Sequence, residues 1–277
     1  MATNETQPQA PLMTHAQSAD GTPIAFERLG HGPPLIVVGG ATCDRAKMRA
    51  VSEAFAADFA VINYDRRGRG DSGDTPPYAV EREVEDIAAL IDEAGGSASL
   101  YGHSSGAALA LHAAARALPI DRLILHEPPY SPDTGEARHE ARRYGEQLEA
   151  ILSEGRHGDA VELFFTLVGM PPEMVAEMRG GDPAWAGLEA LAPTLAYDSE
   201  VMGDVSRGGT VPAALAGRVT APTLVLVGGA GPDWMVDIGR QVAEAVPNGE
   251  RRVLEGQEHV VAPEILAPVV KEFLGER

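Results

Sequence analysis

The stretch ASLYGHSSGAALALHAAARAL, residues 98–118, decides the fold. Its first four residues have the composition of a buried strand, and residues 106–118 form an alanine-rich helical pattern. Between them, Gly102-His103-Ser104-Ser105-Gly106 matches G-x-S-x-G. A serine on a sharp turn between a strand and a helix exposes its hydroxyl, and the flanking glycines let neighbouring backbones approach. The stretch therefore predicts a nucleophile at Ser104, with the backbone N–H of Ser105 placed to stabilise an oxyanion.

Strand and helix patterns alternate on both sides of this stretch. Apolar runs predict further strands at 34–38, 60–64, 123–125, 223–227 and 252–254, and helical patterns occupy 46–59, 79–93 and 263–273. Two strand-like runs, 13–16 and 23–27, flank Asp20-Gly21, a dipeptide typical of a hairpin turn. Because strands that alternate with helices are joined by crossover connections, we predict an α/β fold with a mostly parallel, doubly wound sheet.

The alternation stops between residues 128 and 220. This segment is helix-like throughout and is interrupted by glycine and proline, for example at Pro171-Pro172 and Gly180-Gly181. Ligands of open α/β sheets bind at the carboxyl edge of the strands, which an insertion at this point can cover. We predict a helical cap over 128–220, a sheet core over 12–127 and 221–277, and a mobile tail over 1–11.

Several segments resemble the α/β-hydrolase superfamily, and they occur in the order typical of its members. They are Asp20-Gly21-Thr22, Gly39-Gly40, the run DRRGRGDS at 65–72, the stretch 102–106 and a late histidine. The resemblance covers nearly the whole chain and implies an α/β-hydrolase fold. Members usually carry His-Gly after the third strand, where this chain has Gly39-Gly40. The resemblance places the second oxyanion donor at the backbone N–H of Ala41, since a backbone donor does not depend on its side chain.

The resemblance also implies a histidine base after the last strand. His259 stands there, just past 252–254, and it is the only histidine after His157. A loop histidine at this place can reach a nucleophile at the edge of the sheet. We therefore predict that His259 deprotonates Ser104.

Two acidic residues, Asp233 and Glu127, are candidates for the group that orients His259. Asp233 follows the strand 223–227, which is the commoner position in the superfamily, but it comes after a proline where a helix begins. Glu127 follows the strand 123–125. The stretch 101–129 is similar to that of fungal zearalenone-type lactonases, whose triad glutamate occupies this strand end, and this similarity favours Glu127 over Asp233.

The composition excludes several classes of partner. With 41 acidic and 22 basic residues, the formal net charge is −19, so nucleic acid and anionic membrane surfaces repel the chain. The single cysteine, Cys43, excludes an intramolecular disulfide framework and a cysteine-rich zinc site. We expect no metal and no cofactor, because metal-ligand spacing is absent and the G-x-G-x-x-G run at 68–73 does not open a helix.

The location and the assembly follow less directly. The sequence has no apolar run of about 18 residues and no visible secretory signal. We therefore expect a cytoplasmic protein with no membrane partner; the sequence indicates no oligomeric state.

The motifs together predict a serine-dependent hydrolase of a carboxylic ester or lactone of an apolar small molecule, acting through an acyl-enzyme. The same triad can also serve a carbon–carbon bond hydrolase or a thioesterase. A small-molecule receptor on the hydrolase fold, with little turnover, is the alternative from a different class.

Overall fold

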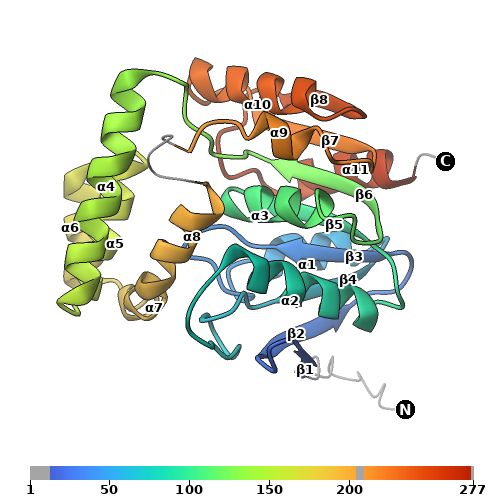
Figure 1. Cartoon of the computed structure of the whole chain (residues 1–277), viewed down its shortest axis with the longest axis horizontal. Coiled ribbons are helices and arrows are strands. Elements are labelled where there is room, and N and C mark those ends of the chain that lie inside the picture. Colours follow the sequence, from blue (N-terminus) through green and yellow to red (C-terminus); the bar gives the residue numbers. More distant parts are fainter. Residues whose placement is uncertain (1–12, 204–208, 276–277) are drawn as a thin grey trace, which may run out of the picture.

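Eight strands form one sheet in the computed structural model, which describes residues 13–203 and 209–275 (Figure 1). The strand order is β1-β2-β4-β3-β5-β6-β7-β8. β1 and β2 run antiparallel to their neighbours, and the other neighbouring strands are parallel. The strands are β1 (Thr14–Gln17), β2 (Pro23–Leu29), β3 (Pro34–Val38), β4 (Ala60–Tyr64), β5 (Ala98–His103), β6 (Ile120–His126), β7 (Thr223–Gly228) and β8 (Gly249–Leu254). The predicted fold class is confirmed; the predicted tail, 1–11, lies outside the described residues.

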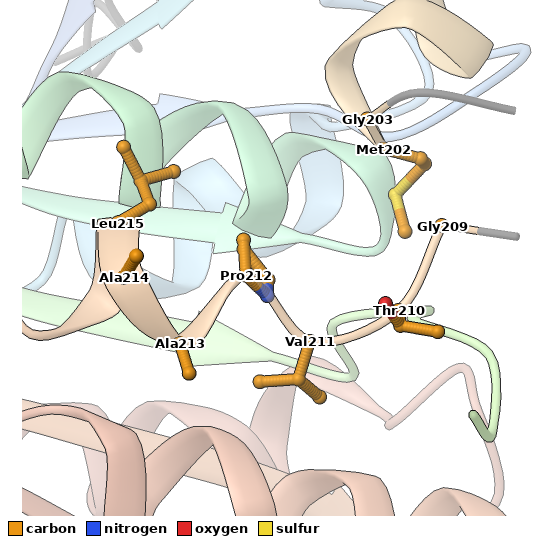
Figure 2. Close-up of a pocket in the computed structure, with 9 residues that line it drawn as sticks. All are labelled: Met202, Gly203, Gly209, Thr210, Val211, Pro212, Ala213, Ala214 and Leu215. Carbon is orange, nitrogen blue, oxygen red and sulfur yellow. The ribbon is translucent and has the colours of Figure 1, made fainter. Parts of the chain in front are cut away.

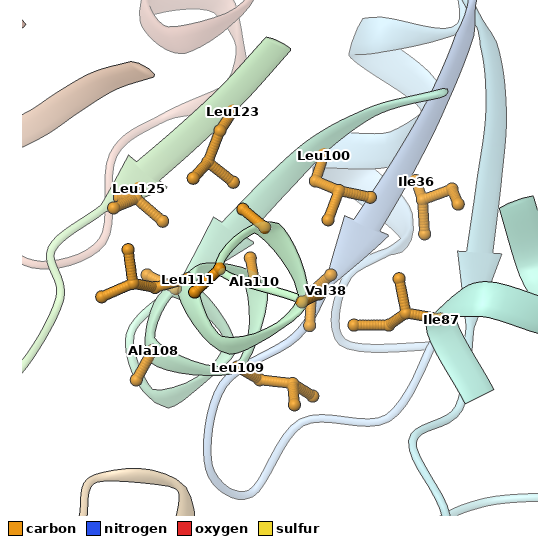
Figure 3. Packing of buried hydrophobic residues seen from close by; sticks show 14 of the residues in the cluster. Ile36, Val38, Ile87, Leu100, Ala108, Leu109, Ala110, Leu111, Leu123 and Leu125 are labelled. Carbon is orange, nitrogen blue, oxygen red and sulfur yellow. The ribbon is translucent and has the colours of Figure 1, made fainter. Parts of the chain in front are cut away.

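Helices cover both faces of the sheet because strand side chains alternate between the faces. In β3, Leu35 and Val37 belong to one buried cluster, whereas Ile36 and Val38 belong to another. Figure 3 shows the second cluster, where Val38 and Leu100 lie beside the alanine-rich helix α3. The first cluster is covered by α1 (Arg49–Phe55) and α11 (Pro263–Gly275), and the second by α2 (Val80–Glu93), α3 (Ser105–Ala114) and α10 (Asp233–Ala245).

Two of the helices are shorter than their sequence patterns predict. The pattern 106–118 predicts a helix to Leu118, but α3 ends at Ala114 and Ala117 has a φ of 56°. Pro119 disfavours the helical conformation in the residue before it, so the chain turns there toward β6. The helix predicted over 46–59 spans only Arg49–Phe55. It starts late because the Asp44 carboxylate accepts a hydrogen bond from the Lys47 N–H within a separate turn.

Between β6 and β7 the chain forms a group of helices, here called the helical insertion (residues 128–220). In Figure 1, α4–α7 stand together to one side of the sheet. Their buried apolar side chains, among them Val161, Phe165 and Leu188, form a cluster separate from the two sheet clusters. The helices are α4 (Gly135–Ser153), α5 (His157–Leu167), α6 (Pro172–Gly181), α7 (Trp185–Leu191), the 3₁₀ turn Ala192–Thr194, α8 (Leu195–Val201) and α9 (Ala213–Ala216). That the insertion covers Ser104 stays a prediction.

Helix α8 connects the insertion to the core. Tyr197 on α8 stacks on Tyr78, with 3.9 Å between the ring centroids, and α8 also contacts α2 and α3. Within the described residues, no helix has both the length and the apolar character needed to span a membrane.

Candidate active site

Ser104 occupies a strained turn between β5 and α3. Its φ of 56° and ψ of −127° lie in a region that costs a non-glycine residue on the order of 1–3 kcal/mol. The Ser104 N–H donates to the carbonyl of His126 at 2.9 Å, which ties the turn to the end of β6. A Cβ on Gly106 would lie 2.3 Å from the carbonyl oxygen of Val38, so only glycine lets α3 begin this close to β3. The surrounding backbone therefore imposes the turn that G-x-S-x-G predicts.

The loop after β3 approaches Ser104 from the side opposite β6, since β5 lies between β3 and β6 in the sheet. A Cβ on Gly40 would lie 2.8 Å from the Cβ of Ser104, so the loop can pass this closely only with glycine at position 40. Ala41, a predicted oxyanion donor, follows directly in the loop. Ser105, the other predicted donor, is the first residue of α3, where the helix dipole favours negative charge. The two backbone N–H groups belong to segments that both adjoin Ser104.

Glu127 and His259 are hydrogen bonded to each other. Glu127 follows β6 with a φ of 53°, is 3% exposed, and accepts a hydrogen bond from the backbone N–H of Gly228 at the end of β7. Its second carboxylate oxygen, Oε2, accepts a bond from His259 Nδ1 at 3.1 Å. Because Nδ1 carries the proton in this bond, Nε2 of a neutral His259 is left as the basic nitrogen.

Asp233, the alternative acid, has different surroundings. It is the first residue of α10, follows Pro232, and is exposed. His259 donates its hydrogen bond instead to the buried Glu127 carboxylate. This geometry favours Glu127, and the assignment of the acid stays a prediction.

Two further histidines extend from this site: His103 packs on the ring of His259, and His126 packs on the ring of His103. The His103 Nε2–H donates to the backbone carbonyl of His259 at 3.0 Å, and the two rings lie 4.8 Å apart. Burial and the neighbouring His259 lower the pKa of His103 to about 4, so its ring stays neutral near pH 7. Burial and the other two histidines hold the pKa of His126 well below its usual value, and its Nδ1 is hydrogen bonded to the Tyr101 hydroxyl at 2.6 Å.

Four buried charged residues and the neutral Ser105, here called the anchor cluster (Arg66, Arg69, Glu83, Ser105 and Asp198), lie where α8 meets the core. Arg66 bonds both oxygens of Glu83 and donates to Asp198 Oδ1 at 2.7 Å. Arg69 donates to both oxygens of Asp198 at 2.9 Å. Burial raises the pKa of the Asp198 carboxyl, but Arg69 and Arg66 outweigh it and hold this pKa below its usual value. Asp198 is therefore an ionised carboxylate between two guanidinium groups.

Two open pockets involve the insertion. One, of about 280 Å³, lies between the loop residues 44–47 and α7. The other, of about 330 Å³, is lined by residues 202–203 and 209–215 and contains none of the predicted catalytic residues (Figure 2). Within residues 13–203 and 209–275, no group of three or more histidine, cysteine, aspartate or glutamate side chains is arranged to hold a metal ion.

The sequence motifs did not reveal two residues beside the site. Asp198 lies far from Arg66 along the chain, so no local pattern pairs them. The only signal was indirect: buried arginines in the run DRRGRGDS need carboxylate partners. His103 is part of the G-x-S-x-G match, but its bond to the His259 backbone joins segments from opposite ends of the core.

Comparisons with known proteins agree with the fold. An alpha/beta hydrolase from Sphaerobacter thermophilus, of known crystal structure, is 50% identical, with a TM-score of 0.83 over 94% of this chain and 100% of that chain. A thermophilic esterase from Thermogutta terrifontis is 24% identical and shares the fold, with a TM-score of 0.67 over 95% of this chain and 98% of the other. N-formylmaleamate deformylase from Pseudomonas putida is 38% identical over 119 residues, which are 41% of this chain and 44% of the deformylase.

The match to N-formylmaleamate deformylase thus spans less than half of that protein's length. The likeness to zearalenone-type lactonases stays a prediction. The sequence profile of the Alpha/beta hydrolase family matches residues 31–268, which is most of the chain. Together with the eight-stranded sheet, this match shows that the chain belongs to the alpha/beta hydrolase family.

Proposed function

We propose that this chain is a serine hydrolase that cleaves a carboxylic ester or lactone of an apolar small molecule through an acyl-enzyme. One observation carries the proposal: His259 Nδ1 donates to the buried Glu127 carboxylate, at the same edge of the sheet as the strained turn of Ser104. A base held in one tautomer beside a nucleophile on such a turn is the arrangement that acyl transfer requires.

In the proposed reaction, His259 Nε2 takes the proton of Ser104 Oγ as the serine attacks the acyl carbonyl. The backbone N–H groups of Ala41 and Ser105 stabilise the negative charge on the carbonyl oxygen. His259 then gives the proton to the leaving alcohol, and the acyl group stays on Ser104. Water, activated by His259, attacks the acyl-enzyme and releases the acid. Glu127 stabilises the positive charge that His259 carries during both steps.

The apolar character of the substrate is inferred from the surroundings of Ala41. The Ala41 side chain packs against the apolar cluster of the insertion, which includes Phe165 and Trp185. An acyl group bound to Ser104 would therefore lie near apolar side chains. We infer that the helical insertion is a cap and that its side chains select the substrate.

A second candidate is hydrolysis of an N-formyl or other N-acyl bond. The 38% identity to N-formylmaleamate deformylase over 119 residues favours it, and the proposed triad can attack an amide carbonyl as well as an ester. Carbon–carbon bond hydrolysis, thioester hydrolysis and a receptor role with little turnover stay open beside these two candidates.

The decisive experiment combines covalent labelling with a panel of substrates. A fluorophosphonate should label the chain at Ser104, as located by peptide mass spectrometry, and Ser104→Ala should abolish the label. Turnover of p-nitrophenyl esters should exceed turnover of N-formyl amides and thioesters of matched acyl size. Faster deformylation would select the second candidate. An unlabelled protein without turnover would exclude the serine mechanism and favour a receptor.

A further inference from the structure

We propose that Asp198 is a positioning residue that links the helical insertion to both oxyanion donors; this inference rests on the serine-hydrolase function proposed above. Asp198 comes from α8 of the insertion, whereas Ser105 and the loop that carries Ala41 belong to the core. Asp198 is 6% exposed, and the anchor cluster connects its side chain to both core segments.

The first connection is direct. The Ser105 Oγ–H donates to Asp198 Oδ1 at 2.7 Å, and both groups are buried. Ser105 supplies one proposed oxyanion N–H and follows the nucleophile immediately. Its bond to Asp198 therefore restrains the first turn of α3 at the point where the oxyanion would form.

The second connection runs through the two arginines. Arg69, held by both oxygens of Asp198, donates from Nη1 to the carbonyl of Gly40 and, at 3.2 Å, to that of Cys43. Arg66 donates to the carbonyl of Gly39 at 3.4 Å. These three carbonyls belong to the loop that carries the N–H of Ala41. One carboxylate thus fixes the guanidinium groups that hold this loop in place.

The charges explain why the carboxylate is needed. Arg66 and Arg69 bring two positive charges, and Glu83 and Asp198 bring two negative charges, all in buried side chains. Without the charge of Asp198, Arg69 loses its carboxylate partner and only Glu83 remains to balance two guanidinium groups. Because an uncompensated buried charge is strongly unfavourable, the arginines would move and release the loop carbonyls.

The first readout does not depend on activity. In full-length Asp198→Asn, amide hydrogen exchange should rise by about tenfold or more in peptides that cover 39–43 and 104–106, while strands β6 and β7 keep their protection. Asp86→Asn is the matched control, since Asp86 is buried and bonds Arg67 through both oxygens. Arg67 contacts Asp20, Ser18 and the carbonyl of Arg82, all outside the loop that carries Ala41.

The second readout is kinetic and is normalised to the number of sites that a fluorophosphonate titrates. For Asp198→Asn we expect kcat per titrated site on a p-nitrophenyl ester to fall about tenfold or more, with KM within about threefold. Removal of one oxyanion donor lowers kcat about 10²–10³-fold. The expected fall is smaller here because the donors are displaced rather than removed. The affinity for a boronic acid, which mimics the tetrahedral adduct, should fall in parallel with kcat/KM. Asp86→Asn should keep the wild-type kcat per titrated site.

A purely structural role would lower only the number of titrated sites in Asp198→Asn, and this result would overturn the proposal. If Asp198→Asn does not fold, Ser105→Ala decides, since it removes only the hydroxyl bonded to Asp198 and keeps the N–H. It should raise exchange in 104–106 and lower kcat about threefold, and unchanged exchange and kcat would refute the link. If the wild type neither labels nor turns over esters, the proposed function fails, and hydrogen exchange still decides whether Asp198 holds the loop.

Discussion

The sheet core and the helical insertion are held in place by different interactions. In the core, strands such as β3 send alternate side chains into two apolar clusters, and the three predicted triad residues come from the loops at the strand ends. The insertion has its own apolar cluster, and α8 joins it to the core through the anchor cluster and the stacked ring of Tyr197. The comparison indicates that the proposed chemistry belongs to the core, while the insertion contributes through one buried carboxylate and an apolar surface.

The largest expected effect is in the core, at the nucleophile. Ser104→Ala should lower kcat on an activated ester by roughly 10³-fold or more, because the step that forms the acyl-enzyme is lost. Circular dichroism should show an unchanged fold, since the alanine keeps the backbone turn between β5 and α3. Near-normal turnover by this variant would remove Ser104 from the mechanism.

The next effect separates the two candidate acids. Glu127→Gln keeps the shape of the side chain but removes the charge that supports protonated His259, so kcat should fall at least about 10²-fold. Asp233→Asn is the matched control, and its kcat should stay within about tenfold of wild type, because an exposed acid in the first helical turn acts mainly on stability, by about 0.3–1 kcal/mol. A large loss of kcat in Asp233→Asn, with little loss in Glu127→Gln, would instead assign the acid to Asp233, after β7.

A matched pair of cavity mutants tests whether the core and the insertion unfold separately. Leu123→Ala in β6 and Leu188→Ala in α7 each remove a buried leucine side chain, at a cost of about 2–5 kcal/mol. Hydrogen exchange should increase throughout the sheet in Leu123→Ala, but mainly in α4–α8 in Leu188→Ala, because Leu188 belongs to the separate cluster. Equal losses of protection in both regions, in both variants, would mean that they form one cooperative unit.

The smallest effect concerns pH and His103. Its folded pKa of about 4 lies below the value of about 6.5 for a free histidine, so the unfolded chain binds a proton more readily between these pH values. The free energy of unfolding should therefore fall on acidification from pH 7 to 5, and His103→Gln should reduce this fall by about 1–2 kcal/mol. Urea titrations of both proteins at pH 7 and pH 5 measure the free energy of unfolding.

The exposed His139 of α4 supplies the control for this experiment, as His139→Gln. It should leave the pH dependence of unfolding as in the wild type. The same pH dependence in His103→Gln as in the wild type would show that His103 is not the group responsible.

The sequence predicts more of the core than of the insertion, for a physical reason. Buried parallel strands appear as short apolar runs, and the carboxyl ends of neighbouring strands meet at one edge, so the local patterns around Ser104 and Glu127 also carried their position in space. The pairing of Glu127 with His259 follows from that topology, and the structure forms this hydrogen bond. The end of α3 was misjudged because alanine-rich helical propensity continues past Ala114, whereas Pro119 stops the helix early.

No comparable rule relates the sequence of the insertion to the positions of its residues in space. Its helices pack through irregular contacts, and the partner of a buried arginine can come from any distant segment. Asp198 therefore looked like one of many surface acids in a chain with 41 acidic residues, until the structure placed it between Arg66 and Arg69.

The anchor cluster has a consequence for building chimeras. A helical insertion grafted onto this core from another hydrolase would meet two buried guanidinium groups at its junction, whatever its own apolar side chains. The graft is compatible only if it presents a carboxylate where Asp198 stands, or if Arg66 and Arg69 are replaced together with it. Recombination libraries that exchange this segment should therefore hold that one position fixed and let the rest of the helices vary.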